Sequence, residues 1–478
     1  MKIVHLSAEC YPVAKVGGLA DVVGALPRYL NKQSANASVV MPKYANEWVS
    51  EHEFETVLSG SAPLGHWQFD YRIQRETADT LGFPLYVIDI PGRFDRPGVY
   101  TDEESGGSYW DDFERFASFQ IVALDWFNRM EEKPEIIHCH DHHTALVPFM
   151  ITQSYRYMDL KHIPTVLTVH NAEYHGVYDK EKAYLLPHFD ERDMGLLDWD
   201  GRLNCLAAGL KTCWEIATVS HSYMNELAYN SNGLEWLFQN ETQKSRGIIN
   251  GIDTDVWDPE TDPMIAEHYS QRKMAAGKRE NKRVLCDRFG LDPQYPTISF
   301  IGRLVHEKGA DMLPDLFRTY LESPQSVNFI VLGTGDRSLH HQFQAMSDRF
   351  VGYFDATLDY NESLAHQIYA GSDFMIMPSR VEPCGLNQMY SMRYGTVPIV
   401  RNIGGLKDTV VDIGTSDGYG ITFNDFTLHA AQDAVQRAID LFQDGRKMAG
   451  IRKRIMNLDF SWNASAKEYI NMYKQLSE

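Results

Sequence analysis

The chain has 478 residues and a formal net charge of −20, from 45 basic and 65 acidic residues. A chain of this length exceeds what one compact core usually supports, so we expect two domains of ordinary size. The acidic excess argues against a nucleic-acid partner, because binding a phosphate backbone needs a basic surface. A neutral ligand, or an anionic ligand held by a few local cations, is compatible with this charge.

Neither a membrane span nor a secretory leader is predicted. There is no run of about 18 apolar residues, and the first apolar segment, KIVHLSA, passes at once into polar and glycine-containing sequence, unlike a signal peptide. The six cysteines are scattered without a CxxC pair: Cys10, Cys139, Cys205, Cys213, Cys286 and Cys384. This usage is typical of reduced thiols, so we expect a cytoplasmic protein with no membrane partner.

Short apolar runs alternate with longer amphipathic segments along the chain. The first half contains KIVHLS, ASVVMP, LYVIDI, EIIHCH, TVLTVH and IATVS, and the second half contains TISFIG, NFIVLG, FMIMPS and VPIVR. Apolar runs of this length, bounded by polar residues or glycine, indicate buried parallel strands joined by crossover helices. The predicted fold class is therefore α/β, with two doubly wound, Rossmann-like lobes.

Glycine, aspartate and proline accumulate in residues 248–263, between the two series of strands. Such a segment is typical of a junction, so we expect one lobe over residues 1–248 and a second over 249–458. The last segment, 459–478, contains FSWNASAKEYINMYKQL, which has the pattern of a capped amphipathic helix. We expect this helix to pack back on the N-terminal lobe.

The segment IIHCHDHHTAL, residues 136–146, concentrates side chains of the kinds that bind transition metals. In a doubly wound sheet, ligands bind outside the carboxyl ends of the strands, which is where this cluster falls. On a strand, His138 and His140 share one face and Cys139 takes the other, so the polar side chains cannot all converge on one ion. We favour a ligand-facing strand end without a metal, and a metal site is the alternative.

Lys15, Gly17 and Gly18 precede a segment whose apolar residues keep helical spacing, in AKVGGLADVVGALPRYL at 14–30. Two glycines let the backbone approach a ligand closely, and a helix N-terminus offers N–H groups and a positive dipole end to an anion. An ordinary glycine turn is the alternative for this segment taken alone.

The second lobe has a richer set of strand-end residues. Arg303 and Lys308 follow the strand TISFIG, and Glu382 follows FMIMPS, directly before a predicted helix that starts at Leu386. The N–H groups of Gly385 and Leu386 should face the same crevice as Glu382, and a second glycine pair follows in IGGLKDTV. Taken singly, these features have ordinary explanations as a solvated ion pair or a helix cap.

Together, these loops suit a ligand that carries a diphosphate and a sugar. Lys15, Arg303 and Lys308 could hold the negative charge that develops on a leaving nucleoside diphosphate, without a metal ion.

The motifs resemble those of the bacterial glycogen synthases and plant starch synthases, which are glycosyltransferases of the two-lobed GT-B fold. They occur in the family's order: KVGGLADVVGALP, HCHDHHTALVP, TVHN, GIINGIDTDVWDPETDP, GRLVHEKG, LGTGD, IYAGSDF, SRVEPCGLNQ, YGTVPIVRNIGGLKDTV and FSWNASAKEY. The resemblance covers nearly the whole chain, and EPCGL followed by YGTVP and GGLKDTV is its most specific part.

This resemblance implies elongation of α-1,4-glucan at its non-reducing end, with retention at the anomeric carbon. The donor would be a nucleotide-activated glucose, ADP-glucose in most bacterial members, which is a substrate and leaves the enzyme with no metal or other cofactor. The N-terminal lobe would carry the acceptor side and the C-terminal lobe the nucleotide sugar, facing each other across a cleft. Retention without a protein nucleophile would proceed by front-face attack.

The resemblance also implies residue roles. The donor-binding residues would be Lys15, Gly17, Gly18, Asp21, Asn250, Tyr360, Cys384, Gly385 and Leu386. The residues at the reaction centre would be Glu382, Arg303, Lys308 and His170. Arg303 and Lys308 would stabilise the departing diphosphate, Glu382 would anchor the glucose hydroxyls, and His170 would lie beside the glucosyl ring.

HCHDHHT resembles the family segment His-x-His-Asp-Trp-His-Thr, a wall of the cleft, and places His140, Asp141 and His142 on the acceptor side without a metal. Two positions depart from the family pattern. His142 stands where the family has Trp, which would affect acceptor stacking or the packing of this wall, and Val16 stands where the family has Thr or Ser. Since the core motifs are intact, we expect an active enzyme.

Three alternatives remain from the sequence. A metal-dependent transferase would use paired aspartates in DWD at 198–200 or DTD at 253–255, although both lie in segments where we predict no flanking strand. A catalytically silent glucan-binding protein could share the fold. UDP-glucose could replace ADP-glucose as the donor.

Overall fold

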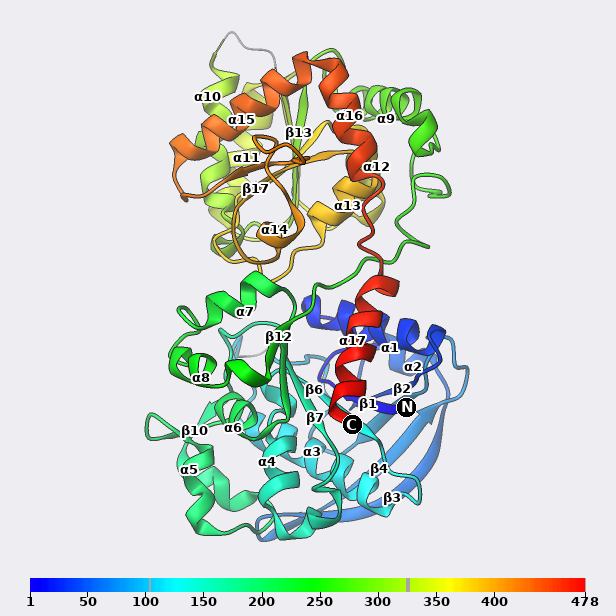
Figure 1. Ribbon diagram of the computed structural model, residues 1–478, viewed down its shortest axis with the longest axis vertical. Helices are drawn as coiled ribbons and strands as arrows, with labels where there is room; N and C mark the ends of the chain where they lie inside the picture. The colour runs from blue at the N-terminus through cyan, green and yellow to red at the C-terminus, as the bar shows by residue number, and fades with distance from the viewer. Residues whose placement is uncertain (103–104, 324–326, 478) are drawn as a thin grey trace. The chain divides into compact units, whose positions relative to one another are not determined.

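The computed structural model describes residues 1–102, 105–323 and 327–477. It consists of two compact units, each built around its own large sheet (Figure 1). Unit 1 comprises Met1–Val219, Met224–Ile249 and Trp462–Glu478, and unit 2 comprises Ser220–Tyr223 and Asn250–Ser461. The main passage into unit 2, at Asn250, lies inside the segment 248–263, and the chain rejoins unit 1 at Trp462.

The large sheet of unit 1 has nine strands in the order β12-β11-β7-β6-β1-β2-β5-β4-β3. Neighbours from β12 to β5 run parallel, whereas β4 is antiparallel to both β5 and β3. The bounds are β1 Lys2–Leu6, β2 Asn36–Pro42, β3 Phe54–Leu64, β4 Trp67–Glu76, β5 Leu85–Asp89, β6 Ile136–His140, β7 Thr165–Val169, β11 Glu215–Thr218 and β12 Ser245–Gly247. The six strands predicted for the N-terminal lobe are all present.

Unit 1 buries its central strands. Every residue of β6, β7 and β11 is buried, so neither face of these strands carries the regular exposed polar positions of a half-exposed strand. The helices are α1 Gly18–Lys32, α2 Glu47–Glu51, α3 Asp112–Arg129, α4 Leu146–Gln153, α5 Met194–Leu197, α6 Cys205–Thr212, α7 His221–Leu227, α8 Glu235–Asn240 and α17 Trp462–Ser477. Of these, α7 begins in unit 2 and ends in unit 1.

The first and last helices of unit 1, α1 and α17, lie side by side (Figure 1). Val22 and Leu26 of α1 share one hydrophobic core with Trp462 and Tyr469 of α17, and this core reaches Ile136 of β6. The C-terminal helix is therefore an integral part of unit 1, because its apolar face has no other cover.

Besides the short strand β12, two further features of unit 1 were not predicted. The long strands β3 and β4 form a hairpin at the edge of the sheet, with a left-handed glycine, Gly65, in the turn. A second, three-stranded antiparallel sheet has the order β8-β10-β9, with bounds β8 Val177–Tyr178, β9 Asp198–Trp199 and β10 Arg202–Asn204. The expectation that DWD has no flanking strand is wrong, since Asp198 begins β9, and the Asp198 carboxylate pairs with Lys180.

Unit 2 has one sheet of six parallel strands in the order β15-β14-β13-β16-β17-β18. The strands are β13 Thr297–Ile301, β14 Asn328–Leu332, β15 Phe354–Thr357, β16 Phe374–Met377, β17 Val397–Arg401 and β18 Ile421–Phe423. The helices are α9 Met274–Phe289, α10 Leu313–Leu321, α11 Arg337–Arg349, α12 Glu362–Gly371, α13 Asn387–Arg393, α14 Gly404–Thr409, α15 Leu428–Gln443 and α16 Gly445–Ile455. The predicted class, two doubly wound α/β units, is confirmed, and only the short strands β15 and β18 were missed here.

All six cysteines are free and buried. Among the described residues, no helix is long and apolar enough to cross a membrane.

Candidate functional site

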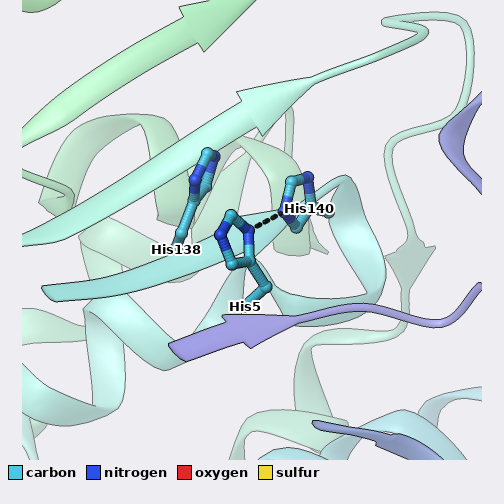
Figure 2. A group of neighbouring side chains, drawn as sticks. All are labelled: His5, His138 and His140. Carbon is cyan, nitrogen blue, oxygen red and sulfur yellow. Dashed lines mark hydrogen bonds between the residues drawn. The ribbon is translucent and has the colours of Figure 1, made fainter. Parts of the chain in front are cut away.

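The histidine cluster of unit 1 is assembled by two neighbouring strands, β1 and β6. His5 pairs with His138 in the parallel register of these strands, so His5 joins the two histidines of HCH. Figure 2 shows His5, His138 and His140 gathered together, with a hydrogen bond between His5 and His140. His5 Nδ1 lies 3.0 Å from His140 Nε2. All three rings are buried. His5 was not among the predicted site residues.

The bonding of His138 bears on the alternative of a metal site. One potential ligand atom from each of the three rings lies within 4.8 Å of the others. Nevertheless, His138 Nδ1 lies 2.6 Å from the Tyr473 hydroxyl, and His138 Nε2 lies 2.6 Å from Oγ1 of Thr168. Both nitrogens of the His138 ring are therefore engaged in hydrogen bonds, which binding of a metal ion at this ring would have to replace.

His140 and His170 are brought together as neighbours on β6 and just after β7. His140 Nδ1 lies 3.0 Å from His170 Nε2, and the His170 backbone N–H donates to Oδ1 of Asp141 over 2.7 Å. His140 is 0% exposed, so it lies behind His170 and has no surface with which to touch a glucan. His140 is one of the three residues expected on the acceptor side, and it can act there only through His170.

Asp141 has a strained backbone, with φ 56° and ψ −176°, a region that residues other than glycine rarely adopt. Burial raises the pKa of Asp141 to about 7, although backbone N–H groups of His170 and Asn171 oppose that rise. This carboxyl therefore ties the end of β6 to the end of β7, at the edge of the sheet where ligands of such folds bind.

His142 begins a short 3-10 turn, His142–Thr144, and its ring contacts the His143 ring in a tilted arrangement with centroids 3.7 Å apart. The ring also lies close to Gly176, where an added Cβ would come within 2.6 Å of His142 Cδ2. Burial lowers the pKa of His142 to about 4. The His142 imidazole is therefore packed against the His143 ring and Gly176.

The lysine-glycine loop of unit 1 is organised by an acidic residue that was not predicted, Glu9. Its Oε2 accepts hydrogen bonds from the N–H groups of Val16 and Gly17, at 2.5 and 2.9 Å. Its Oε1 accepts from the Tyr100 hydroxyl at 2.6 Å. The Gly17 amide, expected near a phosphate, already faces a carboxylate. A polar residue just after the carboxyl end of β1 was the available signal.

The rest of this loop contains the Lys15–Asp21 ion pair and two glycines beside open space. Lys15 Nζ pairs with Oδ1 of Asp21 at 2.6 Å. An added Cβ at Gly17 or Gly18 would meet nothing within 4 Å, so the two glycines border free space that a ligand can enter. The helix α1 begins here without a side-chain cap.

Unit 2 pairs the predicted cation and the predicted carboxylate directly. Lys308 Nζ donates to Oε1 of Glu382 over 2.6 Å, and the Ser379 hydroxyl donates to Oε2 over 2.8 Å. Glu382 is only 5% exposed, whereas Lys308 is partly open to solvent. The ammonium group is thus held at a fixed point by a buried carboxylate and can still meet an anion.

Other predicted residues of unit 2 differ in their surroundings. Arg303 is 66% exposed and makes a loose ion pair with Glu307 at 3.4 Å, and Tyr360 is 75% exposed at the loop before α12. Asn250 is buried, and its Oδ1 has no hydrogen-bond partner among the described residues. Cys384 is buried too, and burial raises its pKa to about 12, which keeps the thiol protonated.

The loop 382–386 approaches the glycine pair after β17 at backbone distance. The Gly405 N–H donates to the Glu382 carbonyl over 3.1 Å. An added Cβ at Gly404 would come within 2.0 Å of that carbonyl oxygen, and one at Gly405 within 2.0 Å of the Cys384 carbonyl oxygen. Gly385 itself is left-handed, with φ 74°. The second glycine pair therefore supports the Glu382 loop, and Gly385 and Leu386 lead from it into α13.

Replacing Gly405 with alanine is expected to lower the stability of unit 2 by about 1–3 kcal/mol, because the new Cβ must push the Cys384 carbonyl away. Thermal unfolding monitored by circular dichroism checks this. Gly450→Ala is the matched control, since Gly450 lies in α16 and its added Cβ meets nothing within 4 Å. That change should stabilise the protein slightly, and equal unfolding temperatures for the two variants would contradict the proposed contact.

Comparisons with known proteins cover both units. A family model described as starch synthase catalytic domain matches residues 2–240, and a model described as glycosyl transferases group 1 matches residues 282–453. Over 474 residues the chain is 46% identical to a glycogen synthase of Flavobacterium johnsoniae, covering 99% of this chain and 98% of that protein. Over 488 residues it is 35% identical to a glycogen synthase of Streptococcus sanguinis, covering 100% of both.

A solved structure is similar along the whole chain. It is the catalytic domain of starch synthase IV from Arabidopsis thaliana bound to ADP and acarbose, with a TM-score of 0.86 and 30% sequence identity. The match covers 100% of this chain and 99% of that one.

Proposed function

The chain belongs to the glycogen and starch synthase family of GT-B glycosyltransferases, which transfer glucosyl units to glucan, and from this premise we propose that its donor is ADP-glucose. The relative from Arabidopsis thaliana was solved with ADP and acarbose, a nucleotide and an oligosaccharide. The same two ligand classes suit this chain, which has cations at strand ends in both units. The acceptor is the non-reducing end of an α-1,4-glucan.

The observation that carries the proposal is the Lys308–Glu382 pair. In our proposal Lys308 and Arg303 hold the diphosphate, and Glu382 holds hydroxyls of the glucose. Because Glu382 is buried and bonded to both Lys308 and Ser379, it fixes the ammonium group before the donor arrives. A preorganised cation stabilises charge that develops on the leaving group at little reorganisation cost.

The remaining residues of unit 2 contribute to the donor site in this proposal. The backbone N–H groups of Cys384, Gly385 and Leu386 meet the sugar and the distal phosphate. Asn250 offers a buried amide to the same sugar, and Tyr360 flanks the base. Unit 2 is thus the nucleotide-sugar unit.

Unit 1 supplies the acceptor side and part of the donor site. Lys15 and the Gly17–Gly18 turn approach the phosphates, and Asp21 helps to hold the nucleoside. Such contacts require the Lys15–Asp21 pair to open, and at Gly17 the phosphate must share or displace the Glu9 carboxylate. His170 lies beside the glucosyl ring, with Asp141 and His142 toward the acceptor.

The proposed reaction retains configuration and needs no metal ion or other cofactor. The bond between the anomeric carbon and the phosphate oxygen breaks, and the acceptor 4-hydroxyl oxygen bonds to the same face of that carbon. The acceptor proton passes to the departing phosphate oxygen, so atoms and charge balance without a protein nucleophile. Position and electrostatics are then the enzyme's main contributions. Six buried, free thiols suit a reducing compartment, and we propose that the reaction is cytoplasmic.

The test is transfer of labelled glucose from ADP-glucose into glycogen in excess chelator, with UDP-glucose in parallel. Incorporation from ADP-glucose, undiminished by chelator and well above that from UDP-glucose, is the expected result. Preference for UDP-glucose would overturn the donor, and loss of activity in chelator would overturn the metal-independent mechanism. Glycogen binding without transfer from either donor would identify a silent glucan-binding protein.

A further inference from the structure

Three imidazoles of unit 1 form a continuous hydrogen-bonded chain from the interior to His170. His5 Nδ1 meets His140 Nε2 at 3.0 Å, and His140 Nδ1 meets His170 Nε2 at 3.0 Å. The ring centroids are 5.3 and 5.2 Å apart, with interplanar angles of 20° and 35°. Each centroid separation is about the N–N distance plus the centroid-to-nitrogen distance of the two rings. The two centroids and the two nitrogens therefore lie nearly on one line, so each bond runs along the ring planes, as a hydrogen bond requires. Figure 2 shows the inner bond of this chain.

All three rings are neutral at physiological pH. Burial lowers the pKa of His5 and of His170 to about 3, and it lowers the pKa of His140 well below its usual value. A neutral imidazole carries one N–H and one lone pair. Two successive N–H to N bonds can therefore run in only two directions, outward from His5 or inward from His170.

The second nitrogen of His5 decides between these directions. His5 Nε2 is buried and has no hydrogen-bond partner among the described residues. If the bonds run inward, His5 accepts at Nδ1 and must carry a buried N–H at Nε2 with no acceptor. If they run outward, Nε2 is a bare lone pair, and an unsatisfied buried acceptor is more readily tolerated than an orphaned N–H. The outward direction is therefore favoured.

The outward direction fixes the state of His170. His5 donates through Nδ1–H to His140, which donates through its own Nδ1–H to His170 Nε2. His170 must then carry its proton on Nδ1. We propose that His5, acting through His140, is a positioning residue that holds His170 in the Nδ1–H tautomer.

The consequence for function rests on the proposed placement of His170 beside the glucosyl ring. With Nε2 closed off by His140, Nδ1–H is the ring's only donor, and a neutral donor suits a sugar hydroxyl oxygen. The Asp141 carboxylate holds the His170 backbone N–H, and the imidazole chain holds its ring. Backbone and side chain are thus fixed by separate partners, a preorganised arrangement of the kind that orients a reacting sugar.

The hydrogen-bonded series of His5, His140 and His170 also accounts for the histidine cluster better than a metal ion does. His138 stacks on His140, with ring centroids 4.3 Å apart, yet its nitrogens bond to Thr168 and Tyr473 and not to the other two imidazoles. An ion would need a lone pair from His140, whose two nitrogens already bond to His5 and His170.

The direct test is nitrogen-15 NMR of the labelled, full-length protein, through two-bond correlations between ring protons and ring nitrogens. This pattern separates Nδ1–H from Nε2–H tautomers, and His170→Gln assigns the signals of His170. The expected result is a neutral His170 protonated on Nδ1. A neutral His170 protonated on Nε2 would overturn the proposal. This measurement needs no substrate, so a failure of the proposed glucosyl transfer would leave it standing, and the reverse also holds.

Two variants at His5 separate the donor from simple packing. His5→Asn places an amide N–H where Nδ1–H stood, and His5→Leu keeps volume without a donor. His5→Leu is expected to mix the His170 tautomers and to lower kcat about tenfold, the value of one buried hydrogen bond, with less effect on KM for the donor. His5→Asn should restore the tautomer and most of kcat.

Tyr473→Phe is the matched control, since it removes a hydroxyl bonded to His138 at the same depth but outside the chain. It should lower the unfolding temperature and leave the His170 signals and kcat unchanged. Equal losses of kcat in His5→Asn and His5→Leu would reduce His5 to a packing role. Tight binding of Co²⁺ with an imidazole-ligand spectrum, lost in His5→Asn, would replace the proposal with a metal site.

Discussion

Replacing Lys308 with alanine is expected to lower kcat about 100- to 1,000-fold, because in the proposed reaction this ammonium group meets charge that is larger in the transition state than in the bound donor. The donor KM should change less. Steady-state transfer of labelled glucose into glycogen measures both constants. Lys308→Arg should keep part of the activity, since it retains the charge but changes the donor geometry.

The control for Lys308 is an exposed lysine of the same unit. Lys447→Ala, at the start of α16, removes an equal charge with no carboxylate partner in the described structure and should leave kcat close to that of the parent. Because Lys308→Ala leaves the Glu382 carboxylate buried with only Ser379, thermal unfolding of both variants must be followed. Near-normal turnover by a folded Lys308→Ala protein would remove this residue from the reaction centre.

Acidification from pH 7.5 to 5 is expected to lower the free energy of unfolding. Three buried histidines alone contribute about 6 kcal/mol to this loss, a large share of the ~5–15 kcal/mol typical of domains. Burial holds the pKa of His5 and His170 at about 3 and that of His142 at about 4, whereas an unfolded histidine titrates near 6.5. Below pH 6.5 the histidines of the unfolded state bind protons, whereas the same rings in the folded state stay neutral. Each ring then costs about 2 kcal/mol at pH 5.

Asp141 acts in the opposite sense. Its pKa is about 7 in the folded state against 3.8 when unperturbed, so between these values the folded carboxyl keeps a proton that the unfolded chain loses. The stability from this group is fully present below 3.8 and disappears as the pH rises through 7. It therefore offsets roughly one histidine on acidification, and other buried rings, including His138 and His140, act in the same direction as the three above.

Urea unfolding at several pH values measures this linkage. His143→Phe is a suitable control, because burial lowers the pKa of His143, whose ring stacks on Tyr100 at 4.5 Å. Phenylalanine keeps the aromatic contact, and the slope of stability against pH should fall by about one proton. An unfolding free energy that stays flat from pH 7.5 to 5 would mean that these rings titrate normally.

The strands that carry the site were predictable because they are buried on both faces. The strands IIHCH and FMIM have no solvent-facing positions, so a short buried run stands out in the sequence and marks where each strand ends. Lys308 and Glu382 follow such ends, and topology alone brings them to one edge of the sheet. The hairpin β3–β4 lies at a sheet edge, where half-exposed strands mix polar with apolar residues and lose that signal.

The missed residues are those whose importance depends on register or on contacts distant in sequence. His5 matters because β1 pairs with β6 in a register that sets it beside His138, and pairing register is not written in either strand. Glu9 matters because its carboxylate reaches the amides of Val16 and Gly17 across a loop. The sequence placed Gly405 in a ligand-binding turn, whereas in the structure its lack of a side chain lets its backbone approach the Cys384 carbonyl closely.

Because every cysteine is buried, the reactivity of the six thiols reports the unfolding of this protein. Four thiols, Cys10, Cys139, Cys205 and Cys213, belong to unit 1, and two, Cys286 and Cys384, belong to unit 2. Each thiol is buried and its pKa is raised, so alkylating reagents find almost no thiolate on the folded chain. Mass spectrometry after a pulse of iodoacetamide can therefore time the unfolding of each unit separately in the unmodified sequence.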